Sequence, residues 1–263
     1  MTHVRERVAQ YYRRAQRVIC VERSTVQPVQ SNWAPEGFAR TVESELRVES
    51  EAADGGPLPE ARVIRDIRRV NGRAPRERDQ KDRTGCTDPT PLSPELLAFL
   101  LPVHGGEFRF TSVRDGRDKA RPALIVDFMS TNQTSRPELI EDDRGHDDCF
   151  DWSGPIATRG RIWVDATTHD VLRVERRLSG PVDVRVPWKL QRRYNFPAWV
   201  VLERDDLTVR YGAVAFSDPD EVVLLPESID SLTVLRSGLQ SIRRTQTFKD
   251  YRRFLTTGRV KDR

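Results

Sequence analysis

The sequence predicts a mainly β (α+β) fold: one large curved antiparallel sheet, or half-barrel, with two helices packed on its concave face. The clearest observation is a hairpin pattern over residues 160–176, where Ile162 and Val164 alternate with Arg161 and Trp163 before a short polar turn. Successive side chains of a strand point to opposite faces, so this pattern buries one face and exposes the other.

Similar segments recur along the chain, about ten in all, without the strand–helix alternation of a parallel sheet. A sheet with this many strands has to curl, split or close. All-β domains often reach the length of this chain, 263 residues, as one unit. We therefore expect a single half-barrel domain over residues 1–263.

The first element is a predicted amphipathic helix. Val4, Val8, Tyr11, Tyr12 and Ala15 recur with the spacing of one helix face. A helix with a single apolar stripe has to pack against another element, and the sheet is the available partner. We therefore expect the N-terminal helix on the concave face of the sheet.

A second, short helix is predicted near residues 93–101. Ser93 suits the N-cap, Pro94 suits the first helical position, and the apolar residues 96–100 follow. Because proline cannot continue a helix, Pro102 ends it. We expect this helix to share the concave face with the first.

Alternating segments predict the strands, and turn-forming residues predict their ends. Asn71-Gly72 is a strong turn signal, and Asp115-Gly116 is expected to join the two strands of a hairpin. Long loops are expected over 73–91, 130–157 and 181–198, which are rich in proline or charge. The predicted strands span residues 18–26, 38–49, 62–70, 107–114, 121–129, 160–165, 171–176, 199–202, 207–214, 221–225, 228–235 and 242–248; the segments 221–225 and 228–235 form either a strand pair or one bent strand with Pro226 at an edge or bulge.

Composition excludes several classes of protein. Charged residues make up 32% of the chain, the formal net charge is +4, and no segment reaches the roughly 20 consecutive apolar residues of a membrane helix. The charges interleave along the strands, which favours solvated faces over a nucleic-acid footprint. Six arginines are candidates for contact with an anionic partner such as lipid head groups: Arg192, Arg193, Arg243, Arg244, Arg252 and Arg253.

The three cysteines differ in their surroundings. Cys20 lies among valine and isoleucine, which predicts a buried thiol. Cys86 and Cys149 lie in polar, turn-rich stretches and would form a disulfide in an oxidising compartment. With three cysteines, other pairings stay open.

Several segments together resemble a known group of proteins: Val70–Arg73, Arg159–Glu175, Leu225–Ser228 and Phe248–Phe254. The pattern resembles a group of uncharacterised exported β proteins of acidobacterial type. More distantly, it resembles the LolA/LppX-type half-barrels of lipoprotein carriers, in which strand hairpins repeat around an incomplete barrel and a helix lies across the opening. The resemblance implies export, a curved antiparallel sheet and an apolar cavity, and it implies no catalytic residues. The chain is longer than the carriers and richer in arginine.

Catalytic and metal sites are not expected. The acidic stretch 141–149 carries His146 but matches no zinc or calcium spacing. No Gly-x-Ser-x-Gly elbow is present, and His104 and His169 lie in predicted turns or loops. We therefore expect no cofactor and no metal, with a hydrolase as the least favoured function.

The preferred hypothesis is a non-enzymatic exported protein, periplasmic or extracellular, that binds an apolar or lipid-like ligand or a lipoprotein in the half-barrel. Residues 1–20 lack the apolar core of a secretory signal, so export would require a signal that has been removed. The alternative is a structural or protein-interaction module of the cell envelope with a filled core, and peripheral membrane contact is compatible with both. Candidate cavity residues are Tyr11, Tyr12, Phe108, Phe110, Phe128 and Trp163; Trp163 lies on the polar side of its strand, where it either packs under a loop or lines a cavity.

Overall fold

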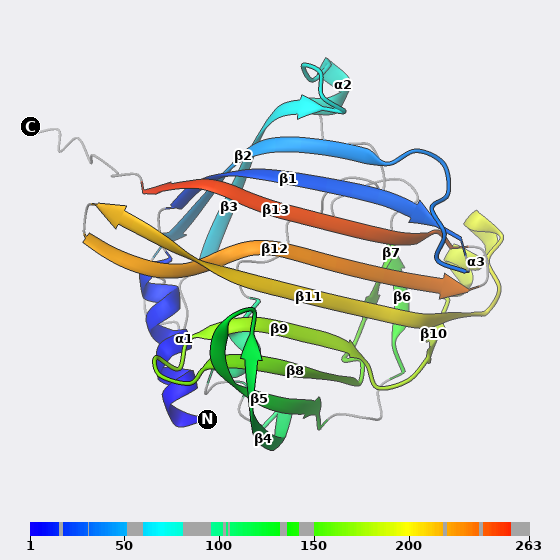
Figure 1. Cartoon of the computed structure of the whole chain (residues 1–263). Helices are drawn as coiled ribbons and strands as arrows, with labels where there is room; N and C mark the ends of the chain where they lie inside the picture. The colour runs from blue at the N-terminus through cyan, green and yellow to red at the C-terminus, as the bar shows by residue number, and fades with distance from the viewer. Residues whose placement is uncertain are drawn as a thin grey trace, which may run out of the picture.

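The computed structural model describes residues 1–15, 18–30, 32–51, 60–80, 96–101, 104, 106–131, 136–141, 150–217, 220–236 and 239–253. Its main feature is one thirteen-stranded sheet that is not closed into a barrel (Figure 1). In chain order the elements are α1 (Thr2–Arg14), β1 (Val18–Val29), β2 (Arg40–Glu51), β3 (Glu60–Val70), α2 (Glu77–Gln80), the 3-10 helix η2 (Ala98–Leu100), β4 (Phe108–Asp118), β5 (Arg121–Ser130), β6 (Glu138–Glu141), β7 (Phe150–Ser153), β8 (Thr158–Asp165), β9 (Val171–Leu178), β10 (Val182–Arg185), α3 (Trp188–Tyr194), β11 (Trp199–Ser217), β12 (Asp220–Arg236) and β13 (Ser241–Arg253). The predicted curved antiparallel sheet is confirmed.

The strand order places the first and last strands side by side. It runs β3-β2-β1-β13-β12-β11-β9-β8-β5-β4, and β10, β6 and β7 branch from β11. Every pairing is antiparallel except one parallel pair, Arg185 with Glu138. The pairing of β1 with β13 joins residues more than 200 positions apart, such as Val26 and Arg244. The long range of this contact means that local patterns could not predict it.

The apolar core follows one cross-strand row on the inner face of the sheet. Val126, Ile162, Val174, Val209 and Ile229 are successive register partners on β5, β8, β9, β11 and β12. All five are buried, and all but the first belong to the largest apolar cluster. The helix α1 adds its apolar stripe to the same cluster, so the predicted helix lies on the predicted face.

A second apolar cluster corrects two of the three predicted loops. The stretch 130–157 contains β6 and β7, and the stretch 181–198 contains β10 and α3. Their side chains surround Leu139, Val184 and Leu190. Prolines and charges hid these short elements, which are held by mutual burial rather than by strong local propensity. The described part of the third loop, residues 73–80, contains α2, and residues 81–91 lie outside the described residues.

Three element boundaries also differ from the sequence prediction. The β4–β5 hairpin turns at Lys119 rather than at Asp115-Gly116, because both strands extend until Asp118 pairs with Arg121. The strand β11 is continuous through residues 203–206, which separated two predicted strands, since β12 pairs with it along its length. Of the predicted helix at 93–101, only the 3-10 turn Ala98–Leu100 is present among the described residues. Pro226 does lie at a bulge, as one predicted alternative required: its neighbour Glu227 is the extra residue of β12, between the pairs Arg210–Ser228 and Tyr211–Pro226.

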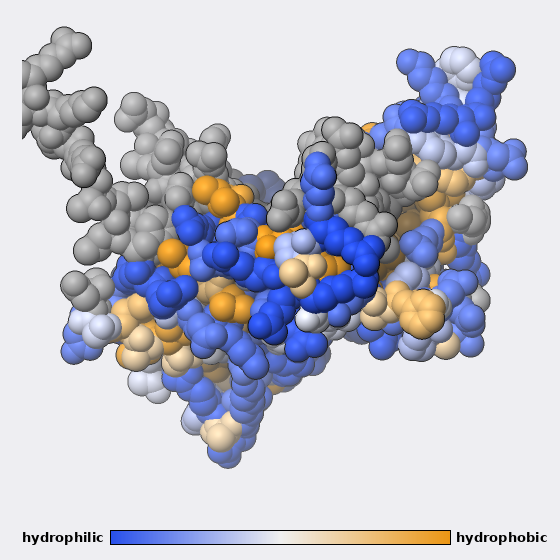
Figure 2. All heavy atoms as spheres, turned by 90° about the horizontal axis from the view of Figure 1, so that it is seen from above, coloured by the Kyte–Doolittle hydropathy of each residue, from blue (hydrophilic) through white to orange (hydrophobic). Residues whose placement is uncertain are grey.

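Seen from above, the surface is mostly hydrophilic, with separate hydrophobic patches (Figure 2). This agrees with charged residues at 32% of the chain and an outer sheet face covered with arginine–carboxylate pairs such as Arg161 with Asp127. The surface is therefore predominantly ionic, as the interleaved charges predicted.

A buried ion pair and a neighbouring hydrogen bond connect the strands β1, β3 and β13. Glu22 of β1 is 1% exposed and accepts two hydrogen bonds from Arg65 of β3, at 2.5 and 3.0 Å. Gln246 of β13 donates a third at 2.7 Å. The nearby Cys20 thiol is buried, as predicted, and burial raises its pKa to about 12.

Replacing one partner of this ion pair is expected to lower the stability of the protein strongly. Arg65→Met leaves the Glu22 carboxylate buried without its cation and lowers the free energy of unfolding by about 3 kcal/mol or more. Adding Glu22→Gln removes the charge and restores most of that stability. Urea denaturation of the two single variants and the double variant measures the coupling, and strictly additive losses would contradict a paired role.

Gly160 of β8 is enclosed by its neighbours. A Cβ atom added there would lie 2.1 Å from the Glu175 carbonyl oxygen and 2.5 Å from the Phe128 ring. Gly160→Ala should therefore lower the free energy of unfolding by about 2 kcal/mol. Gly180→Ala is the matched control, since nothing lies within 4 Å of its added Cβ. Equal stability of the two variants in urea denaturation would refute this packing argument.

Candidate functional site

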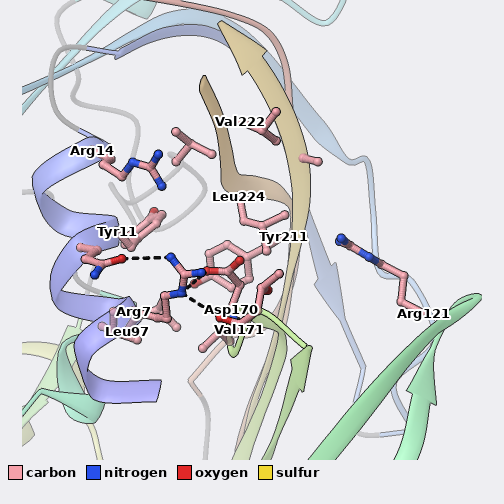
Figure 3. A pocket seen from close by; sticks show the side chains of 15 residues that line it. Arg7, Tyr11, Arg14, Leu97, Arg121, Asp170, Val171, Tyr211, Val222 and Leu224 are labelled. Atoms are coloured by element: carbon pink, nitrogen blue, oxygen red, sulfur yellow. Dashed lines mark hydrogen bonds and ion pairs between the residues drawn. The ribbon is translucent and has the colours of Figure 1, made fainter. Parts of the chain in front are cut away.

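A pocket of about 280 Å³ lies between α1 and the sheet (Figure 3). It is bounded by α1, by the segment before η2, by the first residue of β5, by the β8–β9 turn and by the β11–β12 hairpin. Its lining residues are Arg7, Val8, Gln10, Tyr11, Arg14, Leu97, Arg121, Thr168, Asp170, Val171, Tyr211, Ala213, Val222, Val223 and Leu224.

The floor of the pocket is apolar. Val8 and Leu97 are buried on the helix side, and Val171 and Val223 are buried on the sheet side. Burial of an apolar ligand surface against such a wall is favourable without directional contacts. The pocket can therefore hold a hydrocarbon segment.

Two phenol hydroxyls supply a polar element inside the pocket. Tyr11 of α1 and Tyr211 of β11 meet edge to face, with ring centroids 6.2 Å apart. Burial raises the pKa of both hydroxyls above the usual value, so both stay protonated. Neither hydroxyl makes a hydrogen bond to another residue in the described part of the chain, and a buried hydroxyl of this kind is suited to bond a polar ligand atom.

Arginines surround the mouth of the pocket, and each has a carboxylate nearby. Arg14 is 2.8 Å from Glu221, and Arg121 is 3.6 Å from Asp165. The Arg121 side chain is half exposed and makes no hydrogen bond to Asp165. Of the three arginines that line the pocket, it is the one without a side-chain hydrogen bond to the described residues. Figure 3 shows it reaching from β5, across the pocket from α1.

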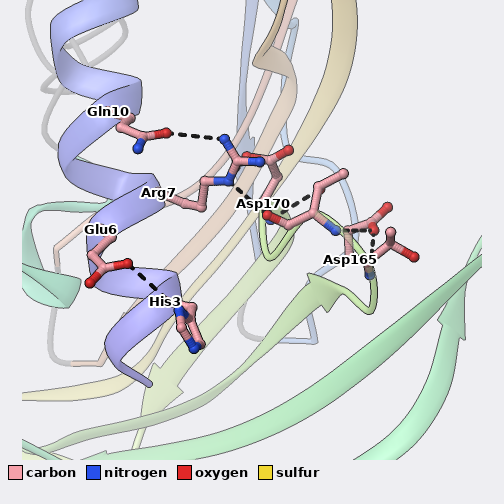
Figure 4. A network of polar contacts seen from close by, with 8 residues as sticks. His3, Glu6, Arg7, Gln10, Asp165 and Asp170 are labelled. Carbon is pink, nitrogen blue, oxygen red and sulfur yellow. Dashed lines mark hydrogen bonds and ion pairs between the residues drawn. The ribbon is translucent and has the colours of Figure 1, made fainter.

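Arg7 anchors α1 to the β8–β9 turn (Figure 4). Its Nε donates to the Thr168 carbonyl oxygen at 2.7 Å, and its Nη1 donates to Gln10 at 3.0 Å. The Asp170 carboxylate lies 3.9 Å away. These contacts position the helix over the turn and fix the width of the pocket at this end.

The Asp165 carboxylate builds the turn that α1 rests on. It accepts hydrogen bonds from the backbone N–H groups of Thr167 and Thr168 at 2.9 and 3.0 Å. Burial alone would raise the pKa of Asp165, but these N–H groups and Arg121 outweigh burial and hold the pKa below its usual value. His169, at the left-handed position of the turn, lies 5.2 Å from the His3 ring of α1.

The predicted cavity residues have different positions. Tyr11 lines the pocket, and the Tyr12 hydroxyl accepts a hydrogen bond from the Leu97 N–H at 3.1 Å. Phe108, Phe110 and Phe128 pack with one another and with Phe99, at ring distances of 5.0 to 6.3 Å, in the cluster beneath α1. They therefore fill the inner face instead of lining the pocket.

Trp163 lies on the opposite face of the sheet from the pocket. It is buried with Ala123 and Leu172 beneath the β4–β5 hairpin, and the Arg173 guanidinium lies 3.5 Å from its ring centroid. Of the two alternatives for this residue, packing under another segment is the one that the structure shows.

The six predicted anion-contact arginines lie away from the pocket lining. Arg192 and Arg193 belong to α3, where the second pairs with Glu141 at 2.8 Å. The other four, Arg243, Arg244, Arg252 and Arg253, belong to β13, where Arg252 pairs with Glu45 at 3.7 Å and Arg253 pairs with Glu221. The sequence prediction did not include the arginines that line the pocket. A signal was present, since Arg7, Tyr11 and Arg14 share the i, i+4, i+7 spacing of one helix face.

Other chemistry finds little support in the described ranges. They contain no group of three or more metal-ligating side chains, and no described helix is long and apolar enough to cross a membrane. His104 pairs with Glu107 at 2.9 Å in a turn. Residues 142–149, including Cys149, and Cys86 lie outside the described residues, so the predicted disulfide is untested.

Comparison with known proteins found similarity only at the level of structure. No protein-family model matches the chain, and no curated protein matches it. The chain is similar to a domain from Vibrio parahaemolyticus assigned to outer membrane lipoprotein-sorting proteins, with 12% identity over 95% of this chain and 92% of that chain and a TM-score of 0.44. It is also similar to the LolA superfamily protein NE2245 from Nitrosomonas europaea, with 10% identity, coverages of 97% and 93% and a TM-score of 0.32.

A weaker match is the MucA/MucB complex from Pseudomonas aeruginosa, with 9% identity, coverages of 96% and 99% and a TM-score of 0.22. The structural neighbours thus include a LolA superfamily protein, the carrier family that the sequence resembles. None of the matches tests the resemblance to the acidobacterial group.

Removing the Asp165 carboxylate should destabilise the turn in a pH-dependent way. Asp165→Ala is expected to lower the free energy of unfolding by about 2 kcal/mol at pH 7. Because the folded-state pKa is depressed, this stabilisation is complete above the unfolded pKa of about 3.9 and is lost as the pH falls through the folded pKa. Urea denaturation from pH 7 down to pH 3 should therefore show the wild type approaching the variant only in acid.

The matched control is Asp183→Ala, since Asp183 is exposed and makes no ion pair with the described residues. It should change the stability little at any pH. A stability difference between wild type and Asp165→Ala that stays constant to pH 3 would show that the carboxylate charge does not stabilise the turn.

Proposed function

We propose that the protein is a non-enzymatic binding protein for a slender amphipathic molecule with one hydrocarbon chain and one anionic head group. The observation that carries this proposal is the pocket itself. An apolar floor, a half-exposed arginine and two tyrosine hydroxyls without a hydrogen-bond partner among the described residues occur together. The pocket volume of about 280 Å³ is just below the roughly 300–1,000 Å³ that is typical of small-molecule sites. This size suits a single chain better than the several chains of a lipoprotein.

In this proposal the hydrocarbon chain lies against Val8, Leu97 and Leu224. The hydroxyls of Tyr11 and Tyr211 bond the polar atoms at the head of the ligand. Arg121 contacts its charge, because an arginine at the mouth can bond a carboxylate or phosphate without leaving water. The proposal includes the periplasmic or extracellular location that the sequence resemblance implies.

Dodecanoate is a suitable probe, with dodecanol as its uncharged counterpart. Isothermal titration calorimetry of the wild type should show saturable binding of dodecanoate, and weaker binding of dodecanol. Ala213→Trp should weaken dodecanoate binding at least tenfold, because Ala213 lines the pocket and is exposed at its mouth, where a larger side chain obstructs entry without disturbing the core.

Ala215→Trp is the matched control, since Ala215 is also exposed, lies two residues along the same strand and does not line the pocket. It should bind dodecanoate like the wild type. Absence of saturable binding by the wild type, or equal binding by the two tryptophan variants, would rule out this pocket as the ligand site.

A second candidate function is an envelope interaction module with a filled core. It is favoured by large aromatic side chains left in solvent, such as Phe38 at 99% exposure and Trp188 at 62%. This function requires no ligand under α1. A wild type that binds no dodecanoate, but loses its association with an envelope fraction on Trp188→Ser, would favour it over the first.

A further inference from the structure

A groove of about 510 Å³ on the outer face of the sheet is rich in arginine. It crosses β4, β5, β8, β9 and β11, and the lining residues Arg159, Arg161 and Arg177 lie on the face that carries Trp163. Five arginines and three carboxylates line it, so the groove carries a net charge of +2. This imbalance differs from the matched charges over most of the outer face.

Three of the five arginines have carboxylate partners. Arg161 is 2.9 Å from Asp127, Arg176 is 3.5 Å from Asp205, and Arg204 pairs with Asp206. These arginines and carboxylates neutralise one another. The third carboxylate that lines the groove, Glu175, lies 3.7 Å from Arg173. Arg159 and Arg177 are therefore the two lining arginines without a carboxylate partner among the described residues.

Arg159 of β8 and Arg177 of β9 are direct register partners, so their side chains leave the sheet from neighbouring positions on one face. Neither makes an ion pair or a hydrogen bond with any residue in the described ranges. Both are exposed. Like charges placed directly opposite each other across a strand pair are destabilising, so this arrangement is unfavourable unless an anion lies between them.

The surrounding groups suit an oxyanion. A guanidinium presents paired N–H donors that match two oxygens of one phosphate, and two adjacent guanidiniums can share a tetrahedral group with three free oxygens. Thr208 of β11 lines the same groove and offers a hydroxyl donor. A phosphate has more oxygens and more negative charge than a carboxylate, so it matches two guanidiniums and a hydroxyl donor more fully.

We propose that Arg159 and Arg177 form a binding site for a phosphate group on the outer face of the sheet. The site is separate from the pocket under α1 and goes beyond the proposed function. Its ligand is either a soluble phosphate compound or the phosphate of a lipid head group, and the chemistry of recognition is the same for both.

The first experiment measures the thermal unfolding midpoint against inorganic phosphate, with sodium chloride at equal ionic strength as the reference. The wild type should show a saturable increase with phosphate beyond the chloride effect. The double variant Arg159→Gln/Arg177→Gln should lose this increase or need at least tenfold more phosphate. The control double variant Arg192→Gln/Arg243→Gln removes the same charge from elsewhere and should respond like the wild type.

A second measurement tests the repulsion directly, without any ligand. Arg177→Glu places a carboxylate opposite Arg159 and should raise the unfolding midpoint at low salt, by an amount that declines as salt is added. An unchanged or lower midpoint would contradict the opposed arrangement of the two arginines.

Vesicle sedimentation distinguishes the two sources of phosphate. Binding to phosphatidylglycerol vesicles but not phosphatidylcholine vesicles, lost in Arg159→Gln/Arg177→Gln, identifies a lipid head group. A response to inorganic phosphate without vesicle binding identifies a soluble phosphate compound. Phosphate that acts no better than chloride, or a double variant that responds like the wild type, overturns the proposal.

The outcome is independent of the proposed function. Ala213→Trp obstructs the pocket under α1 and should leave the phosphate response unchanged. Failure of dodecanoate binding with an intact phosphate response would refute only the pocket, and the reverse result would refute only the groove.

Discussion

An open sheet with one apolar face cannot remain uncovered in water, and this constraint governs the rest of the structure. The row from Val126 to Ile229 crosses five strands without a polar interruption. Closing the barrel would hide this row, but the sheet stays open, so α1 and the segment around η2 cover it. Every feature of the inner face follows from how one straight helix packs on a curved sheet.

A straight helix does not follow a curved surface along its whole length, and the pocket lies where contact is incomplete. Around Val4 and Val8 the helix is in close contact with the core. Beside the β11–β12 hairpin and the first residue of β5 the surfaces diverge, and tyrosine and arginine side chains line the space. The β8–β9 turn holds the helix in this position through Arg7 and the carbonyl oxygen of Thr168. The turn thus contributes to the pocket without supplying its apolar floor.

The two faces of the sheet differ in how they accommodate charged side chains. The inner face excludes water, and the buried charge of Glu22 is retained there with close partners in Arg65 and Gln246. The outer face is solvated and is organised by arginine–carboxylate pairs, among which Trp163 packs beneath a hairpin. Arg159 of β8 and Arg177 of β9 differ from these pairs, since neither has a carboxylate partner among the described residues. The hydroxyls of Tyr11 and Tyr211 under the helix likewise have no hydrogen-bond partner within the described ranges.

The sequence by itself determined the faces and the class of the fold. Strict alternation placed Ile162 inside and Trp163 outside, and helical spacing gave α1 one apolar stripe, because these periods follow from backbone geometry alone. Only the tertiary structure decided which strands pair, such as β1 with β13. It also decided where short elements form, such as β10 and α3. It also brought Arg7, Arg121 and Tyr211 to one pocket from three distant segments. Contacts of this range depend on the packing of the whole chain, and no local pattern encodes them.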